Sequence, residues 1–81
     1  MSSSKVQLKG MEARDRMYRL CNARMYFTCG SPSQYGKFFD LVERGVHLEI
    51  IATTLWICSS DTFDYDSIYR DCYETLMVEK N

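Results

Sequence analysis

The clearest pattern of polar and apolar positions lies in residues 31–45 and predicts a helix with defined ends. Ser31 suits the N-cap, Pro32 the first helical position, and Gln34 completes a capping box. Apolar side chains then recur at i, i+3, i+4 and i+7, which gives a core-facing stripe of Tyr35, Phe38, Phe39 and Val42. Gly45 favours the left-handed position after a helix, so the helix is predicted to end at Arg44.

The segment before it, from Lys5 or Met11 to Thr28, is predicted to form an amphipathic basic helix. One arc of this helix is apolar and contains Met11, Met17, Tyr18, Cys21 and Met25. The opposite arc is basic and contains Lys5, Lys9, Arg16 and Arg19. Residues 25–29 suit a short strand equally well, because short apolar runs are ambiguous. Residues 1–5 are expected to fray.

A third helix is predicted from Val46 or His47 to about Cys58. Its broad apolar face contains Leu48, Ile51, Ala52, Leu55, Trp56 and Cys58, while Ile50 and Ile57 lie nearly opposite. A helix that is apolar on two sides is either central or meets a partner chain. We therefore expect Ile50, Ile57 and Trp56 to form an oligomer interface.

A last helix is predicted from Asp64, as its N-cap, to about Val78. Its inward side chains are Tyr65, Ile68, Tyr69, Cys72 and Leu76, and its outward ones are Asp64, Asp71 and Glu74. Taken together, these patterns predict an all-α fold in a single domain over residues 1–81, a compact bundle of three to four short helices. A hydrophobic fraction of 46% supports a folded chain, and oligomerisation is a further source of stability at 81 residues.

Charge is divided unevenly along the chain, although the whole carries a net charge of only −1. Residues 1–30 contain six Lys and Arg and two acids, whereas residues 31–81 contain four and nine. Such asymmetry indicates attraction between the two halves, within a chain or between subunits, or separate faces for partners, and the plain alternative is that exposed charges only keep the domain soluble. The candidate partner contacts are Arg16, Arg19, Asp64, Asp71, Glu74, Tyr26 and Tyr73.

Catalytic, metal and cofactor signatures are absent from the sequence, which predicts a protein that is not an enzyme and binds neither metal nor cofactor. The cysteines Cys21, Cys29, Cys58 and Cys72 form no C-x-x-C pair, and we expect reduced thiols in the core. His47, the only histidine, is expected to cap a helix or face solvent. We recognise no signal peptide or bilayer-spanning segment and expect a cytoplasmic protein.

Two other functions remain as alternatives. Residues 41–45 followed by residues 46–55 resemble the lead-in and first helix of helix-turn-helix regulators, which implies a nucleic-acid-binding regulator. The chain has Trp56 where that family has glycine, and an acidic recognition helix near Asp61–Asp66 would be repelled by phosphates, so direct DNA binding ranks lower. The second alternative is an oligomer that sequesters a nucleotide, with Tyr26 and Tyr73 stacking on the base.

A further resemblance is based on two short segments. Residues Tyr26–Gly30 precede the capped helix, and residues Ile57–Ser60 end the helix after it. With them the chain is similar to small helical proteins encoded by bacteriophages and mobile elements. That resemblance implies a stoichiometric binder that inhibits or redirects a host or defence component. The leading expectation is a non-enzymatic protein that binds a protein partner, with nucleic-acid-handling proteins among the candidates because an acidic surface complements a basic groove.

Overall fold

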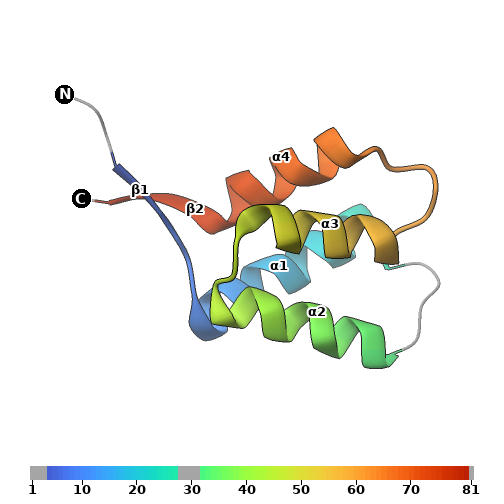
Figure 1. Ribbon diagram of the computed structural model, residues 1–81, viewed down its shortest axis with the longest axis horizontal. Coiled ribbons are helices and arrows are strands. Elements are labelled where there is room, and N and C mark those ends of the chain that lie inside the picture. Colours follow the sequence, from blue (N-terminus) through green and yellow to red (C-terminus); the bar gives the residue numbers. More distant parts are fainter. Residues whose placement is uncertain (1–3, 28–31, 81) are drawn as a thin grey trace.

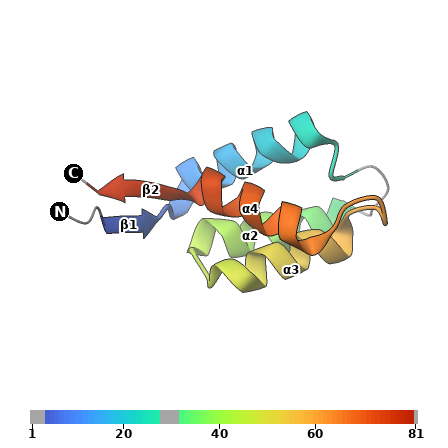
Figure 2. The same cartoon turned by 90° about the horizontal axis from the view of Figure 1, so that it is seen from above.

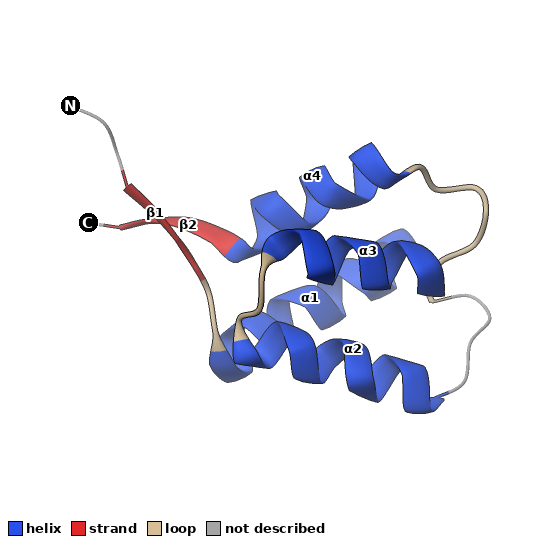
Figure 3. Cartoon of the chain, viewed as in Figure 1, coloured by secondary structure: helices blue, strands red, loops and turns tan. Residues whose placement is uncertain are grey.

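The computed structural model describes residues 4–27 and 32–80, which form four helices and two short strands (Figures 1 and 3). In chain order these are β1 (Ser4–Gln7), α1 (Gly10–Arg24), α2 (Pro32–Arg44), α3 (Leu48–Cys58), α4 (Tyr65–Leu76) and β2 (Met77–Lys80). The predicted all-α bundle of short helices is confirmed. The two strands are an addition that the sequence pattern did not predict.

Successive helices run in opposite directions, as the colour order in Figure 1 shows. Each helix packs against its neighbours in sequence, and α1 also packs against α4, which closes the bundle. Consequently α1 and α3 occupy opposite corners, α1 behind and α3 in front in Figure 1, and Figure 2 shows the same separation from above. Their outer faces therefore point away from each other.

Helix α2 has the ends that the sequence predicts. It begins at Pro32 and ends at Arg44, and Gly45 has a φ of +72°. A Cβ atom at Gly45 would also collide with the side chain of Lys9, so this turn requires glycine for two reasons. The predicted N-cap, Ser31, lies outside the described residues.

Helix α1 is shorter than predicted. It begins at Gly10, which agrees to within one residue with the predicted start at Met11 and excludes the start at Lys5, and it ends at Arg24 rather than Thr28. Met25 adopts a left-handed conformation with a φ of 57°, and the N–H of Tyr26 then bonds to the carbonyl of Cys21 at 3.0 Å. This turn ends the helix and directs the chain back toward the core. Residues 25–27 are therefore neither helix nor strand, and residues 28 and 29 lie outside the described part.

The terminal strands correct two predictions. Ser4 and Lys5 belong to β1 instead of fraying, and α4 ends at Leu76, so that Val78 lies in β2 rather than in the helix. The strands pair antiparallel with Val6 opposite Val78. Four antiparallel helices bring both ends of the chain to the same end of the bundle, which allows this pairing (Figure 3).

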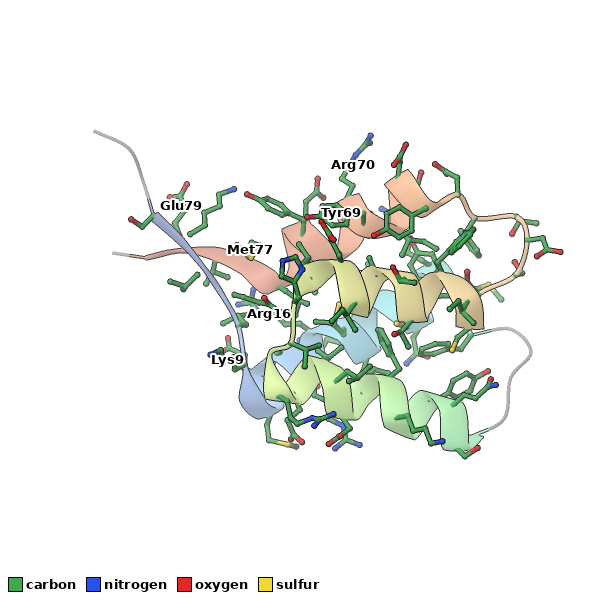
Figure 4. All side chains as sticks on the ribbon, in the orientation of Figure 1. Lys9, Arg16, Tyr69, Arg70, Met77 and Glu79 are labelled. Carbon is green, nitrogen blue, oxygen red and sulfur yellow. The ribbon has the colours of Figure 1, made fainter. Side chains whose placement is uncertain are left out.

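The small sheet is joined to the bundle by side-chain and backbone contacts. The N–H of Leu8 donates to the carbonyl of Leu76 at 2.8 Å, and the Gln7 side chain donates to the carbonyl of Val46 at 2.7 Å. The Lys5 ammonium lies 5.0 Å from the centre of the Tyr73 ring. Figure 4 shows Met77 where β2 meets the helices, and its side chain packs against the core.

The core receives residues from every helix. Its buried side chains are Ala13, Met17, Cys21, Tyr26, Phe38, Phe39, Val42, Leu48, Ile51, Ala52, Leu55, Ile68, Cys72 and Leu76. The predicted inner faces of α2, α3 and α4 are largely confirmed, with Trp56 of α3 as an exposed exception. The predicted apolar arc of α1 is wrong in part, because the buried side of the helix includes Ala13 with Met17 and Cys21, while Met11, Tyr18 and Met25 are exposed. A small residue at position 13 lets neighbouring helices approach closely.

Candidate interaction surfaces

The outer side of α1 exposes three large apolar side chains. Met11 is 67% exposed, Tyr18 56% and Met25 66%. Met11 and Tyr18 are seven residues apart, which is close to two helical turns, so they lie on one side of the helix, and Met25 is the left-handed residue that follows its last turn. The Tyr18 ring packs on Phe39 with ring centres 5.6 Å apart and is therefore held in place. We call the set Met11, Arg14, Tyr18 and Met25 the α1 face.

Cations outnumber acids around the α1 face, with five Lys or Arg and two acids in residues 9–25. Arg16 pairs with Glu12 at 3.2 Å, and Arg19 pairs with Asp15 at 2.9 Å. These two predicted contacts are exposed, but each is partly neutralised by an acid one turn away. Within residues 4–27 and 32–80, Lys9, Arg14 and Arg24 form no ion pair, so they carry the unbalanced positive charge.

The outer side of α3 also exposes large apolar side chains, in agreement with the predicted second apolar side. Ile50 is 51% exposed, Trp56 46% and Ile57 71%. No charged residue occurs from Ile50 to Ser60. The Thr54 hydroxyl donates to the carbonyl of Ile50 at 2.8 Å, which satisfies that hydroxyl within the helix. We call the set Ile50, Thr53, Thr54, Trp56 and Ile57 the α3 face.

An aromatic row adjoins the α3 face at its junction with α4. The rings of Trp56 and Tyr65 meet edge to face, with centres 5.9 Å apart, and Tyr69 follows 6.1 Å beyond Tyr65. Figure 4 shows Tyr69 between α3 and α4. A hollow of about 480 Å³ is lined by Trp56, Ile57, Phe63, Tyr65 and neighbouring polar residues. Trp56 and Tyr65 of this row therefore form one side of a depression whose lining is partly apolar and partly polar.

Tyr26 is buried, contrary to its predicted role as a surface contact. It is 1% exposed, its ring lies 4.5 Å from that of Phe63, and its hydroxyl donates to the Asp71 carboxylate. Burial, together with this hydrogen bond and the charge of Asp71, raises the pKa of the Tyr26 phenol. The left-handed turn at Met25 is the physical reason for its inward position. Tyr26 is therefore a structural link between α1 and α4 and presents no surface for stacking on a nucleotide.

The three predicted acidic contacts have different surroundings. Asp64 caps α4, as predicted, because its carboxylate accepts the N–H of Ser67 at 3.4 Å, and hydrogen bonds from Ser67 lower the pKa of this carboxyl. Asp71 is half-buried and accepts the Tyr26 hydroxyl. Glu74 is exposed. The prediction of an outward Asp71 is thus wrong, since this acid is committed to a contact inside the molecule.

Charges of both signs surround a second hollow, of about 430 Å³, between the end of α1 and α4. Its lining includes Arg24, Arg70, Asp71 and Glu74. Figure 4 shows Arg70 projecting outward from α4. The mixture of two guanidinium groups with carboxylates favours neither an anion nor a cation. Tyr73, the other predicted tyrosine contact, is half-buried beneath the Lys5 ammonium.

The thiols and the single imidazole have structural surroundings. Cys21 and Cys72 are buried and free, which confirms the prediction for them, and burial raises the pKa of the Cys72 thiol to about 12. Cys58 is free but only half-buried, and Cys29 lies outside the described residues. His47 caps α3, as expected, by accepting the Glu49 N–H at 3.2 Å. Within the described ranges, no three His, Cys, Asp or Glu side chains gather as metal ligands would.

Comparison with known proteins assigns no family to the chain. No family model matches it, and neither a curated protein nor a solved structure matches it. In the part of the chain that the structure describes, no helix has the length and apolar character needed to cross a membrane. The functional interpretation therefore depends on the two exposed helical faces themselves.

Proposed function

We propose that this protein is a non-enzymatic binding module that attaches through the α1 face to an acidic and partly apolar surface of a partner protein. The observation that carries the proposal is the coincidence, along α1 and the residue that caps it, of exposed Met11, Tyr18 and Met25 with an excess of cations. Apolar anchors surrounded by charge are the composition of non-obligate protein interfaces. Methionine is well suited to such contacts because its flexible, polarisable side chain adapts to different surfaces.

A protein partner fits the α1 face better than a nucleic acid does. Two arginines beside this face, Arg16 and Arg19, already pair with acids, which reduces the charge available to phosphates. The exposed methionines add apolar area, which contributes to binding when it meets another apolar surface. The start of α4, which the helix-turn-helix resemblance would make the recognition helix, exposes Asp64 and Asp66 and would repel DNA.

A binder of this kind acts by occupying a surface, and it thereby inhibits or redirects its partner. The resemblance to small phage-encoded proteins implies the same mode of action, with a host or defence protein as the target. Acidic residues on the partner would speed association with the basic helix, and the apolar side chains would slow dissociation.

The test is capture of partner proteins from a lysate by immobilised protein, compared between two variants of equal charge change. Met11→Glu with Met25→Glu alters the α1 face, whereas Gln34→Glu with Thr62→Glu alters exposed residues elsewhere. We expect the wild type and the Gln34/Thr62 variant to retain the same protein, and the methionine variant to lose it. Equal retention by both variants, or capture that nuclease treatment abolishes, would contradict the proposal.

A further inference from the structure

We propose that a second copy of this chain packs antiparallel on the α3 face, around a two-fold axis that passes between Thr53 and Thr54. This contact is independent of the α1 face, which lies at the opposite corner of the bundle (Figure 2). A dimer formed through α3 would therefore leave both α1 faces accessible.

The spacing of the exposed residues makes the α3 face complementary to itself. Ile50 and Ile57 are equally distant along the helix from the midpoint between Thr53 and Thr54. A two-fold axis at that midpoint places Ile50 of one copy against Ile57 of the other, and the reverse. The two threonine pairs meet at the centre. Each isoleucine would thus bury its side chain against another isoleucine.

The chemistry of the α3 face favours a second copy over a partner of different composition. The surface from Ile50 to Ser60 has no charge with which to select an oppositely charged protein. Interfaces between identical chains have the more apolar and charge-depleted centres. The Thr54 hydroxyl is already bonded to the Ile50 carbonyl, so this side chain can be covered without losing a hydrogen bond to water.

The charges at the two ends of α3 determine the direction of pairing. An antiparallel arrangement brings the exposed Asp61 of one copy to the positive N-terminal end of α3 in the other, where His47 is also exposed. It also keeps the two Glu49 carboxylates at opposite ends of the interface. A parallel arrangement would place these carboxylates side by side, with both positive helix ends together.

The extent of the contact sets the expected affinity. One three-turn helix, with Ile50 and Ile57 on either side of the central threonines and Trp56 at the edge, is expected to cover less area than the roughly 800 Å² per chain of a typical stable complex. We therefore expect a dissociation constant of about 10 to 100 µM, so that the dimer forms within a concentration range accessible to experiment.

Sedimentation equilibrium of the full chain between about 5 µM and 1 mM tests the association, given that affinity range. The wild type should pass from one to two chain masses, and Met11→Glu should do the same. Ile57→Glu should weaken self-association about a hundredfold or more, because it buries an unpaired charge. Its helical circular dichroism should be unchanged, since Ile57 is largely exposed. A wild type that stays monomeric, or equal association of Ile57→Glu, would overturn the proposal.

The antiparallel geometry has its own test. A mixture of isotope-labelled and unlabelled chains should give intermolecular nuclear Overhauser effects between the methyl groups of Ile50 and Ile57. Contacts between Ile50 of one copy and Ile50 of the other would instead show a parallel pair. Intermolecular contacts confined to α1 would contradict the use of the α3 face.

Discussion

The α1 face and the α3 face lie at opposite corners of the bundle and each exposes three large apolar side chains, but they differ in charge. The α1 face includes Arg14 and has ion-paired arginines beside it, whereas the α3 face contains no charged residue and has the acid Glu49 at its N-terminal end. Exposed apolar area is therefore a poor guide to the kind of partner on its own. The charge around that area distinguishes a surface suited to a foreign, oppositely charged protein from one suited to a second copy.

The largest expected effect is a difference in stability between variants on the inner and outer sides of α3. Ile51 is fully buried and its neighbour Ile50 is half-exposed, so the same substitution removes the same atoms from two environments. Ile51→Ala should lower the free energy of unfolding by about 2–5 kcal/mol, whereas Ile50→Ala in dilute, monomeric protein should change it by less than about 1 kcal/mol. Urea denaturation measures both. Similar losses for the two variants would show that Ile50 belongs to the core.

A smaller effect is expected where the end of α1 is fastened to α4. Tyr26→Phe removes the hydroxyl that donates to Asp71 and should cost about 1–3 kcal/mol, because the half-buried carboxylate loses its partner. Tyr18→Phe is the matched control on the α1 face, since the Tyr18 hydroxyl forms no hydrogen bond within residues 4–27 and 32–80. Urea denaturation compares the two variants. If the loss is equal, the Tyr26–Asp71 contact contributes nothing specific.

The stability of the fold should depend on pH in the alkaline range, because of the Tyr26–Asp71 contact and two buried thiols. The folded-state pKa values of Tyr26, Cys21 and Cys72 are raised, so these groups stay protonated in the folded chain where they ionise in the unfolded one. Stability should be complete below about pH 9 and decline as the pH rises toward 12. Each buried thiol adds a slope of up to about 1.4 kcal/mol per pH unit. Tyr26→Phe should reduce the decline above about pH 10, and Tyr18→Phe should not.

Salt should weaken binding by the α1 face more than self-association by the α3 face. Raising NaCl from about 50 to about 500 mM should weaken the complex formed by the α1 face about tenfold, because its arginines contribute Coulomb attraction. Self-association through the α3 face should change less than about twofold, since its centre is uncharged and only Glu49 and Asp61 at its two ends are screened. Isothermal titration and sedimentation provide the two constants. Equal sensitivity to salt would remove the distinction between the faces.

The smallest effect concerns the ion pairs beside the α1 face. Glu12→Gln breaks the exposed pair with Arg16 and should cost no more than about 0.5 kcal/mol of stability. The same change frees a guanidinium group and should strengthen binding of an acidic partner about two- to threefold. Asp40→Gln is the control, because it breaks the Arg44 pair on α2. Weaker binding by Glu12→Gln would show that the acid itself contacts the partner.

Sequence pattern predicted those features that depend on neighbouring residues. Pro32 and Gly45 mark the ends of α2, and Asp64 caps α4, because each acts through its own backbone or the next turn. The exposed Ile50 and Ile57 followed from helical periodicity. The α1 face was assigned to the core because Met11, Tyr18 and Met25 are apolar, although the neighbouring helices pack around Ala13 instead.

Features that depend on distant residues could not be predicted in this way. The pairing of Val6 with Val78 requires the antiparallel bundle to form first. The inward position of Tyr26 depends on a left-handed conformation at Met25, a residue type with no preference for it. Asp71 looks like a surface acid on a helical wheel, and only its contact with Tyr26 shows otherwise.

The most direct test uses Trp56, the only tryptophan in the chain, which lies 46% exposed at the edge of the α3 face and away from the α1 face. Its fluorescence emission can be followed from micromolar to millimolar protein. The emission should shift to shorter wavelength as the concentration rises in the wild type and in Met11→Glu with Met25→Glu, because a second copy covers the indole. It should stay at its dilute value in Ile57→Glu. An emission maximum that is independent of wild-type concentration, or that shifts equally in Ile57→Glu, would contradict the assignment of the two faces.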